Sequence, residues 1–545
     1  MSTHPSIVTL DKKSAPRVIF SGDRLVAVDL PAGTRVIYPK PPLAALPDPD
    51  AAIRYAINHP YNSLPLHARL TPGMKVVIAI DDISLPLPPM RRPDVRERVL
   101  TIVLALLADH GVDDVEMIIA TSVHRRMRGP EIRHMVGDRI FDAYYPKRLY
   151  NHDAEDAKGM KLVGETDLGE RVVLNRKAVE ADLVIYVNLN LVPMDGGHKS
   201  VAVGLCGYES LKPHHNPKVM RDCHSYMDPE TSALATVVER MGRVANRTLN
   251  VFTIETTINN RMFDRPLSFL SKNEDELSPT EKTALRALTF TLDKAPAEAR
   301  ELVFRKVPSP YEITGVFAGE TEAVHPHTLA KSFEQYMVPV KGQADILVTG
   351  IPYISPYNVG SFLNPLLVQV LAQGYLFNCY RGQPLVKKGG TMIITHPCTD
   401  KFDREHHAPY VDFVHNLLAE TRDAGELHRR YEAKFAANPA YIQMYRTGHA
   451  YHPAHPFFMW YWGEAGRQHV GRVIVVGADN DYIPKLLGYE TARSMNEALE
   501  MAKGNMPSPE ITLMHMPPIL MADVSVTAHA PALPQPPAEG AGHGR

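Results

Sequence analysis

The sequence has few of the features that mark a secreted, membrane-spanning or nucleic-acid-binding protein. Its only cysteines are Cys206, Cys223, Cys379 and Cys398. They form no Cys-x-x-Cys pair and are too few for a disulfide framework, so we expect reduced thiols. The longest apolar run, TIVLALLA at 101–108, is much shorter than the ~20 residues that cross a bilayer, and the first residues do not resemble a signal peptide. With 59 basic side chains against 61 acidic ones, no overall field would attract nucleic acid or anionic lipid. We therefore expect a soluble, cytoplasmic protein without a nucleic-acid or membrane partner.

Short apolar runs alternate with helical patterns along the chain, which is typical of an α/β protein. Six runs predict strands: 75–80, 115–121, 182–189, 345–350, 391–396 and 472–477. None alternates strictly between apolar and polar residues, as expected when both faces of a parallel sheet are buried. The segment 93–111 has helical spacing and ends at Gly111, so the first two strands and this helix predict a βαβ unit.

The distribution of these elements predicts two α/β domains with a cofactor and substrate cleft between them. The chain's 545 residues exceed the ~250–300 at which a single core usually stops growing. Three predicted strands precede residue 190 and three follow residue 340, with a stretch richer in charge and proline between them. We place an N-terminal cofactor-binding domain at 1–290 and a C-terminal domain at 291–525. The Pro-, Ala- and Gly-rich end, 526–545, predicts a disordered tail.

Two predicted strands are followed directly by side chains able to do chemistry. Asp81, Asp82 and Ser84 follow the first strand, and His124 follows the second. Ligands bind outside the carboxyl ends of strands in open α/β sheets, and a histidine there can serve as a general base. The alternatives, a polar turn closed by prolines and a surface histidine among arginines, remain open at this point.

The segment GGHKS at 196–200 places Lys199 among small residues. It is not a phosphate loop, because that motif needs glycine directly before the lysine and His198 stands there. A lysine against packed backbone is often desolvated and nucleophilic, although most lysines keep the amine in water. We expect the two glycines to let the backbone approach a bulky ligand.

Histidines near this lysine could bind a metal. Neutral imidazole is a common ligand of zinc, nickel and copper, and at most one of the adjacent His214 and His215 is expected to face an ion. A zinc site would need the set His198, His215, Cys223 and His224, whose spacing matches no standard pattern. Both tryptophans fall in HPAHPFFMWYWGE at 452–464, where we expect core or interface packing, with a pocket wall as the alternative.

Taken in order, these segments resemble the nickel-pincer-nucleotide-dependent lactate racemase family. The resemblance is carried by DDISLP (81–86), IIATSVHR (118–125), the block from YNHDAEDAKG to EADLVI (150–185), GGHKS, GYESLKPHHNP (207–217), VTGIPY (348–353) and VKKGGTMIITH (386–396). It implies an isomerase whose cofactor is a pyridinium bis-thiocarboxylic acid mononucleotide that carries nickel.

The resemblance also implies roles for individual residues. Lys199 matches the lysine that tethers the cofactor covalently, and His215 matches the nickel ligand. His124 matches the base that removes the substrate hydroxyl proton as hydride passes to the cofactor. Asp82 and Ser84 fall at cofactor-contacting positions. The implied partners are a small hydroxy acid substrate and the proteins that build the cofactor.

Several substrate-facing positions depart from the family pattern. Leu85 replaces an arginine and Met194 replaces the second catalytic histidine, while Asn358, Val359 and Phe362 stand, by spacing, for a tyrosine, a glutamine and a lysine. We therefore expect a racemase or epimerase of a 2-hydroxy acid other than lactate, bulkier or less charged, in which Asp195, His198 or another residue supplies the second acid/base. A one-sided redox enzyme with the same cofactor and a catalytically inactive nickel- or cofactor-binding homologue are the alternatives.

Overall fold

The computed structural model describes residues 4–525, so the predicted tail at 526–545 lies outside the described residues. The largely parallel sheets confirm the α/β class. Each of the six predicted strands is a strand, and the predicted helix is α2 (Val95–Asp109), which starts at the N-cap Asp94. No helix within 4–525 is long and apolar enough to span a bilayer.

The first sheet contains the three predicted strands that come early in the chain. Its order is β12 (Ile313–Gly319), β11 (Val251–Ile258), β10 (Leu183–Asn190), β5 (Lys75–Ile80), β6 (Asp114–Ile119) and β7 (Leu149–Asn151). All neighbours run parallel except β12, which is antiparallel to β11. Every residue of β10 is buried, which explains why its sequence is a continuous apolar run instead of an alternating one.

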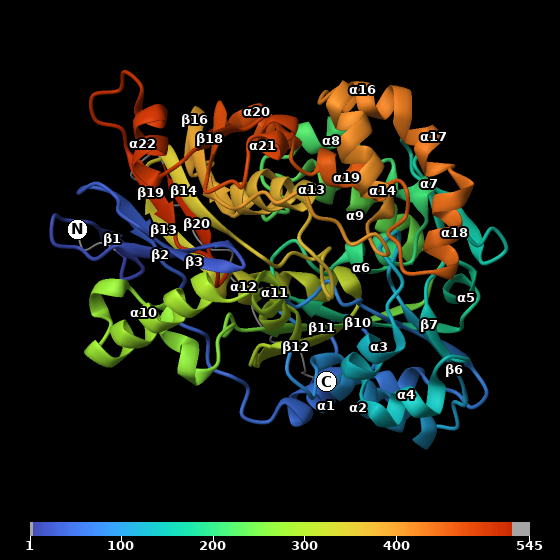
Figure 1. Ribbon diagram of the computed structural model, residues 1–545. Coiled ribbons are helices and arrows are strands. Elements are labelled where there is room, and N and C mark those ends of the chain that lie inside the picture. The colour runs from blue at the N-terminus through green and yellow to red at the C-terminus, as the bar shows by residue number, and fades with distance from the viewer. Residues whose placement is uncertain (1–3, 526–545) are drawn as a thin grey trace.

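Helices cover both faces of this sheet (Figure 1). On one side lie α1 (Pro49–Asn58) and α2, and on the other α6 (His198–Gly204), α9 (Ala233–Asn246) and α12 (Thr321–Tyr336). The helix α9 has apolar residues at helical spacing and buries that face, and α6 packs against it.

The second sheet combines the late strands with the N-terminus of the chain. Its order is β1 (Ile7–Thr9), β4 (Arg35–Ile37), β19 (Ile511–Met514), β14 (Ala344–Pro352), β16 (Val386–Thr395), β17 (Arg472–Val476) and β18 (Glu490–Ala492), with β2 (Arg17–Gly22) beside β14 and β3 (Arg24–Val28) beside β2. The strands from β4 to β18 run parallel. A smaller sheet joins β13 (Met337–Lys341), β20 (Met521–Ser525) and β15 (Tyr380–Gly382), and β8 (Met160–Glu165) pairs with β9 (Arg171–Asn175).

Membership of the sheets does not follow the division placed at residue 290. The strands β1 to β4 belong to the late sheet, and β12, which lies beyond residue 290, belongs to the early one. The charged stretch between the halves contains α10 (Pro279–Lys294), which packs on β3 and has no buried residue, and α11 (Ala297–Lys306). Local sequence patterns could not reveal these exchanges because they depend on pairing between residues hundreds of positions apart.

Candidate active site

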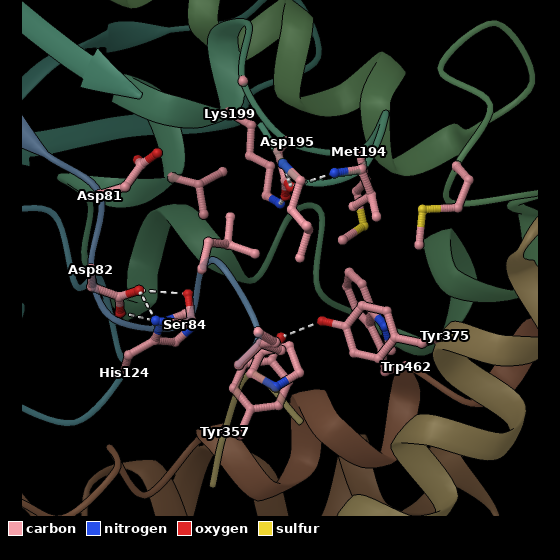
Figure 2. A pocket seen from close by; sticks show the side chains of 18 of the residues that line it. Asp81, Asp82, Ser84, His124, Met194, Asp195, Lys199, Tyr357, Tyr375 and Trp462 are labelled. Atoms are coloured by element: carbon pink, nitrogen blue, oxygen red, sulfur yellow. Dashed lines mark hydrogen bonds and ion pairs between the residues drawn. The ribbon is translucent and has the colours of Figure 1, made fainter. Parts of the chain in front are cut away.

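One cavity of about 260 Å³ receives side chains from elements of both large sheets. From the first sheet its walls include residues that follow β5, β6 and β10, and from the second sheet residues that follow β14. The helices α6 and α19 (His455–Tyr461) add further walls. In Figure 2, Asp82, Ser84 and His124 lie on one side of the cavity, Met194, Asp195 and Lys199 on another, and Tyr357, Tyr375 and Trp462 on a third. The carboxyl ends of the strands thus bring the candidate residues together, as this class of fold usually does.

The first cluster pairs His124 with a buried carboxylate. Nδ1 of His124 lies 2.8 Å from Oδ2 of Asp82, and the backbone N–H of Ser84 donates to Oδ1 of Asp82 over 2.9 Å. Burial alone would raise the pKa of Asp82, but His124 and Ser84 outweigh it and hold the pKa below its ordinary value. A carboxylate only accepts hydrogen bonds, so Nδ1 of His124 is the protonated nitrogen and Nε2 is left to act on a ligand.

A buried arginine holds the aspartate turn in place. Arg96 pairs with Asp94 through two 2.8 Å contacts, and its Nη1 donates to the carbonyl oxygens of Asp81 and Asp82 over 3.2 and 2.7 Å. The carboxylate of Asp81 accepts from Tyr186 and from Asn188, and burial raises its pKa to about 7. Arg96 carries no motif of its own, so the sequence did not mark it as part of the site.

Lys199 and Asp195 face each other at the start of α6. Nζ of Lys199 lies 3.5 Å from Oδ1 of Asp195, and the other oxygen of Asp195 accepts the backbone N–H groups of Leu191 and Val192. The side chain of Asp195 is 3% exposed, against 35% for Lys199. Burial raises the pKa of Asp195 despite the neighbouring ammonium group. The lysine is therefore the accessible partner and the aspartate the desolvated one.

The two glycines before the lysine pack closely against other parts of the protein. Both adopt positive φ, +85° at Gly196 and +60° at Gly197. A Cβ at Gly196 would lie 2.8 Å from Oε1 of Glu255, and one at Gly197 would lie 2.9 Å from the His325 ring. The N–H of Gly197 donates to Glu255 over 2.6 Å. The glycines let the loop close onto Glu255 and His325, and Gly196 also lines the cavity, so the expectation that they let the backbone approach a bulky ligand stays a prediction.

His215 lines the cavity, whereas His214 is buried behind it. Their Nδ1 atoms lie 2.6 Å apart, and the His215 ring stacks on Trp462 with ring centroids 5.7 Å apart. Burial holds the pKa of His215 well below its ordinary value, so the ring is neutral at physiological pH. Within 4–525 its only hydrogen bond is through Nδ1, which leaves Nε2 available to a ligand.

His198 does not line the cavity with Lys199. Its Nε2 lies 2.9 Å from Glu322, and its Cβ would be only 2.3 Å from a Cβ at Gly242 of α9. The alternative zinc set is not assembled either, since His224 contacts the carbonyl of Gly382. In the described part of the chain no three His, Cys, Asp or Glu residues are grouped to hold a metal by themselves.

The positions that depart from the family pattern divide into two groups. Leu85 and Met194 line the cavity, as their motifs predict. The residues chosen by spacing after β14 do not: Asn358 is buried and bonds to Ser355, and Phe362 lies under the ammonium group of Lys401. Tyr357 is the residue of this loop that reaches the cavity, and its hydroxyl lies 2.9 Å from that of Tyr375. Counting residues failed because the loop turns between Tyr353 and Asn358.

The aromatic segment 452–464 is both core and wall. Phe457 and Trp460 are fully buried, as expected for packing, while His455, Phe458 and Trp462 line the cavity. The density of aromatic residues in this segment was the sequence signal for a packed core or a pocket wall. The spacing of these residues could not show which of them face a ligand.

Comparisons with known sequences find relatives of this chain. Residues 22–227 match the family described as the lactate racemase N-terminal domain. The lactate racemase of Thermoanaerobacterium thermosaccharolyticum is 21% identical over 402 residues, which are 71% of this chain and 76% of that protein. The lactate racemase of Lactiplantibacillus plantarum is 26% identical over 106 residues, which are 19% of this chain and 24% of that protein.

Two solved structures share the fold. The lactate racemase apoprotein from Thermoanaerobacterium thermosaccharolyticum superposes with a TM-score of 0.60 at 18% identity, covering 93% of this chain and 100% of that one. A protein from Thermotoga maritima gives a TM-score of 0.50 at 13% identity, with 89% and 100% covered. At such identities these structures establish the fold alone. The domain match and the similarity along most of the sequence make this chain similar to lactate racemase, with which it shares its fold.

Proposed function

We propose that the protein is a nickel-pincer-nucleotide-dependent racemase or epimerase of a hydroxy acid other than lactate. Its homology to lactate racemase supports an isomerase of this general type. The observation that carries the proposal is that Lys199, His215 and His124 line one cavity. In the sequence, His124 and His215 are 91 positions apart (215 minus 124).

The residues present fit the cofactor. Lys199 is the accessible amine of the cavity and would form the covalent bond, while the neutral Nε2 of His215 would be the protein ligand of nickel. A single imidazole suffices where the other donors come from the cofactor, so no cluster of protein ligands is needed. When bound, the cofactor supplies an acceptor and donor of hydride.

His124 acts on the hydroxyl group of the substrate. Asp82 fixes the proton on Nδ1, so the lone pair of Nε2 removes the hydroxyl proton, which makes the carbinol carbon a better hydride donor. The buried carboxylate then stabilises the imidazolium until the proton returns, as in other carboxylate–histidine pairs.

Asp195 is our candidate for the second acid/base. Acylation of Lys199 would turn its ammonium group into a neutral amide, and Asp195 would lose the cation 3.5 Å away. Its pKa, already raised by burial, would then rise further, which favours the protonated carboxyl group that an acid needs. His198 is the weaker candidate because its ring is turned towards Glu322.

The walls of the cavity favour a substrate unlike lactate. Leu85 offers no charge to a carboxylate, and each charge-assisted hydrogen bond lost costs about 1.5–3 kcal/mol. Tyr357, Tyr375 and Trp462 instead present rings and hydroxyl groups. A bulkier substrate with an apolar side chain matches these surfaces better than lactate does.

A one-sided redox enzyme with the same cofactor is the second candidate. The observation that favours it is Met194, whose thioether cannot exchange a proton, at the position of the second histidine. Such an enzyme would oxidise a single enantiomer. The Asp195 variant described in the Discussion separates the two functions.

Intact-mass analysis tests cofactor attachment directly. The protein is made together with the enzymes that build the cofactor, alongside Lys199→Ala and the matched control Lys212→Ala. Lys212 is exposed and does not line the cavity. We expect the adduct mass in the wild type and in Lys212→Ala only. No adduct, or an adduct that survives Lys199→Ala, would refute the proposal, while an adduct without turnover of any hydroxy compound would indicate the inactive homologue.

A further inference from the structure

A second histidine stands beside His124 in the cavity. His455 is the first residue of α19 and is 1% exposed. Its ring centroid lies 5.4 Å from that of His124 and 5.0 Å from that of Tyr357, and all three residues line the cavity. Neither the family motifs nor the proposed chemistry gives His455 a role.

The two nitrogens of His455 have different surroundings. Nδ1 lies 2.5 Å from the hydroxyl of Tyr410, which does not line the cavity and sits behind the ring. Nε2 has no hydrogen-bond partner among residues 4–525, although it is buried. A buried polar atom without a partner costs free energy, and in a cavity the usual compensation is a bound ligand.

The hydrogen-bond pattern fixes which nitrogen carries the proton. Burial raises the pKa of Tyr410 well above its ordinary value, so its phenol stays protonated. His455 is the only hydrogen-bond partner of this hydroxyl in the described chain, so donation to Nδ1 is the one arrangement that satisfies the phenolic proton, and we assign it on that ground. Burial also keeps the pKa of His455 well below 6.5, so the ring is neutral and its one proton sits on Nε2. The cavity therefore holds a neutral N–H donor next to His124.

We propose that His455 binds the substrate by donating a hydrogen bond from Nε2 to an oxygen adjacent to the carbinol on which His124 acts. This inference rests on the proposed function and names the group that recognises the substrate. Tyr410 is a positioning residue, since it acts only through His455. A neutral imidazole N–H can donate to a carboxylate or to a neutral carbonyl oxygen, so this contact by itself does not require an anionic group.

Ligand binding measures the role of His455 without turnover. Two probes share a phenyl group and a ketone: phenylpyruvate carries a carboxylate, and phenylacetone does not. Calorimetric titration of the wild type is compared with His455→Phe, which keeps an aromatic ring but removes the donor, and with His455→Gln, whose amide N–H replaces Nε2–H. We expect His455→Phe to weaken binding about tenfold and His455→Gln to restore most of it. Loss for phenylpyruvate alone assigns the carboxylate, which is the oxygen beside the carbinol position, and supports the inference. Loss for both probes assigns the ketone oxygen, which takes the place of the carbinol oxygen itself, and would overturn the proposed acceptor.

A second measurement guards against an effect of misfolding. In ¹⁵N-histidine NMR, assigned with His455→Phe, the wild type should show Nε2 protonated and Nδ1 not, and Tyr410→Phe should lose this fixed tautomer. Unchanged probe binding in His455→Phe, the opposite tautomer in the wild type, or a wild type that binds neither probe would overturn the inference. Titrations run with and without the cofactor separate the two proposals. If no adduct forms on Lys199 but His455→Phe still loses binding, the proposed function fails and the role of His455 stands.

Discussion

At the scale of single residues, the site depends on which nitrogen or oxygen carries a proton. Asp82 accepts from His124 and from Ser84, so it keeps the imidazole in one tautomer. The turn that holds Asp82 is itself held by Arg96, whose guanidinium group bonds to two of its carbonyl oxygens. Small chemical changes here should alter catalysis more than stability.

The first prediction concerns Asp82→Asn. The amide group can donate to Nδ1 and so move the histidine proton to Nε2, where it blocks the base. We expect turnover to fall by about 10⁴-fold with little change in folding, as for comparable pairs. The measurement is the rate at which cofactor-loaded protein racemises a hydroxy acid, followed by chiral chromatography. Asp94→Asn serves as a control that disturbs the turn through Arg96, and racemisation at the wild-type rate in Asp82→Asn would contradict the assigned base.

The second prediction concerns Asp195→Asn and decides between racemase and one-sided enzyme. In a single turnover of cofactor-loaded protein, the wild-type racemase should oxidise both enantiomers. Without a carboxyl group to carry the proton on the second face, the variant should process one enantiomer and lose the other by at least about 100-fold, the usual contribution of a general acid/base. His198→Asn is the matched control and should keep both. A wild type that already processes one enantiomer would favour the one-sided enzyme.

At the scale of elements, the loop that carries Lys199 is fastened by strand β11 and helix α12. Glu255 of β11 accepts from the backbone of Gly197 and lies 3.1 Å from Nδ1 of His325 in α12. Burial acts to raise the pKa of Glu255 but His325 and Gly197 outweigh it, and the net shift is downward. Burial acts to lower the pKa of His325, but Glu255 outweighs it and the net shift is upward.

The third prediction is that the contribution of the Glu255–His325 ion pair to the free energy of unfolding depends on pH. Because the folded pKa of His325 lies above 6.5, its contribution is complete below pH 6.5 and is lost as pH rises through the folded value. Because the folded pKa of Glu255 lies below 4.5, its contribution is present above pH 4.5 and is lost as pH falls. His325→Gln should therefore cost most between these limits, about 3 kcal/mol for a broken buried pair, and less in alkaline solution.

Denaturant unfolding at several pH values checks this window. His327→Gln is the contrasting control on the same helix, since burial lowers the pKa of His327 and its effect should have the opposite pH dependence. A cost of His325→Gln that did not shrink above neutral pH would show that the ion pair does not stabilise the loop.

At the scale of the whole molecule, N-terminal strands and late strands of the chain pair in one sheet. Ser21 of β2 pairs with Ile351 of β14, and Ile37 of β4 pairs with Met514 of β19. The buried Arg17 adds an ion pair with the exposed Asp275, 2.6 Å away, in the segment that links the two large sheets. The N-terminal strands therefore complete the second sheet and connect it to the rest of the fold.

The fourth prediction follows from this arrangement. Deletion of residues 1–40 should expose β14 and β19 and leave Glu274 and Asp275 without Arg17, so the product should aggregate or lose cooperative unfolding. Deletion of residues 526–545, the predicted tail, should leave the melting temperature unchanged. Thermal melts followed by circular dichroism compare the two. A truncated chain without residues 1–40 that melts like the full protein would contradict this role of the N-terminus.

Much of the fold could be predicted because a strand buried on both faces is a continuous apolar run, which is visible in the local sequence. The six apolar runs and the helix at 93–111 were visible without any knowledge of their partners. The exchange of β1–β4 and β12 between the sheets was not visible, since it is set by long-range pairing. For the same reason Tyr357 escaped prediction, while Asn358 and Phe362 were chosen by spacing and proved to lie elsewhere.

Which residues can do chemistry follows from residue type and order along the chain: the aspartate turn, the histidine after β6, and the lysine and histidine of 196–217. How these residues are used depends on the packing of the folded chain. In the fold, Asp195 faces Lys199, whereas His198 faces Glu322. The two glycines pack against Glu255 and His325. His455, from the distant α19, lies beside His124. The physical reason is that a residue type fixes its donors, acceptors and charge, whereas their direction, burial and partners arise only when distant segments pack together.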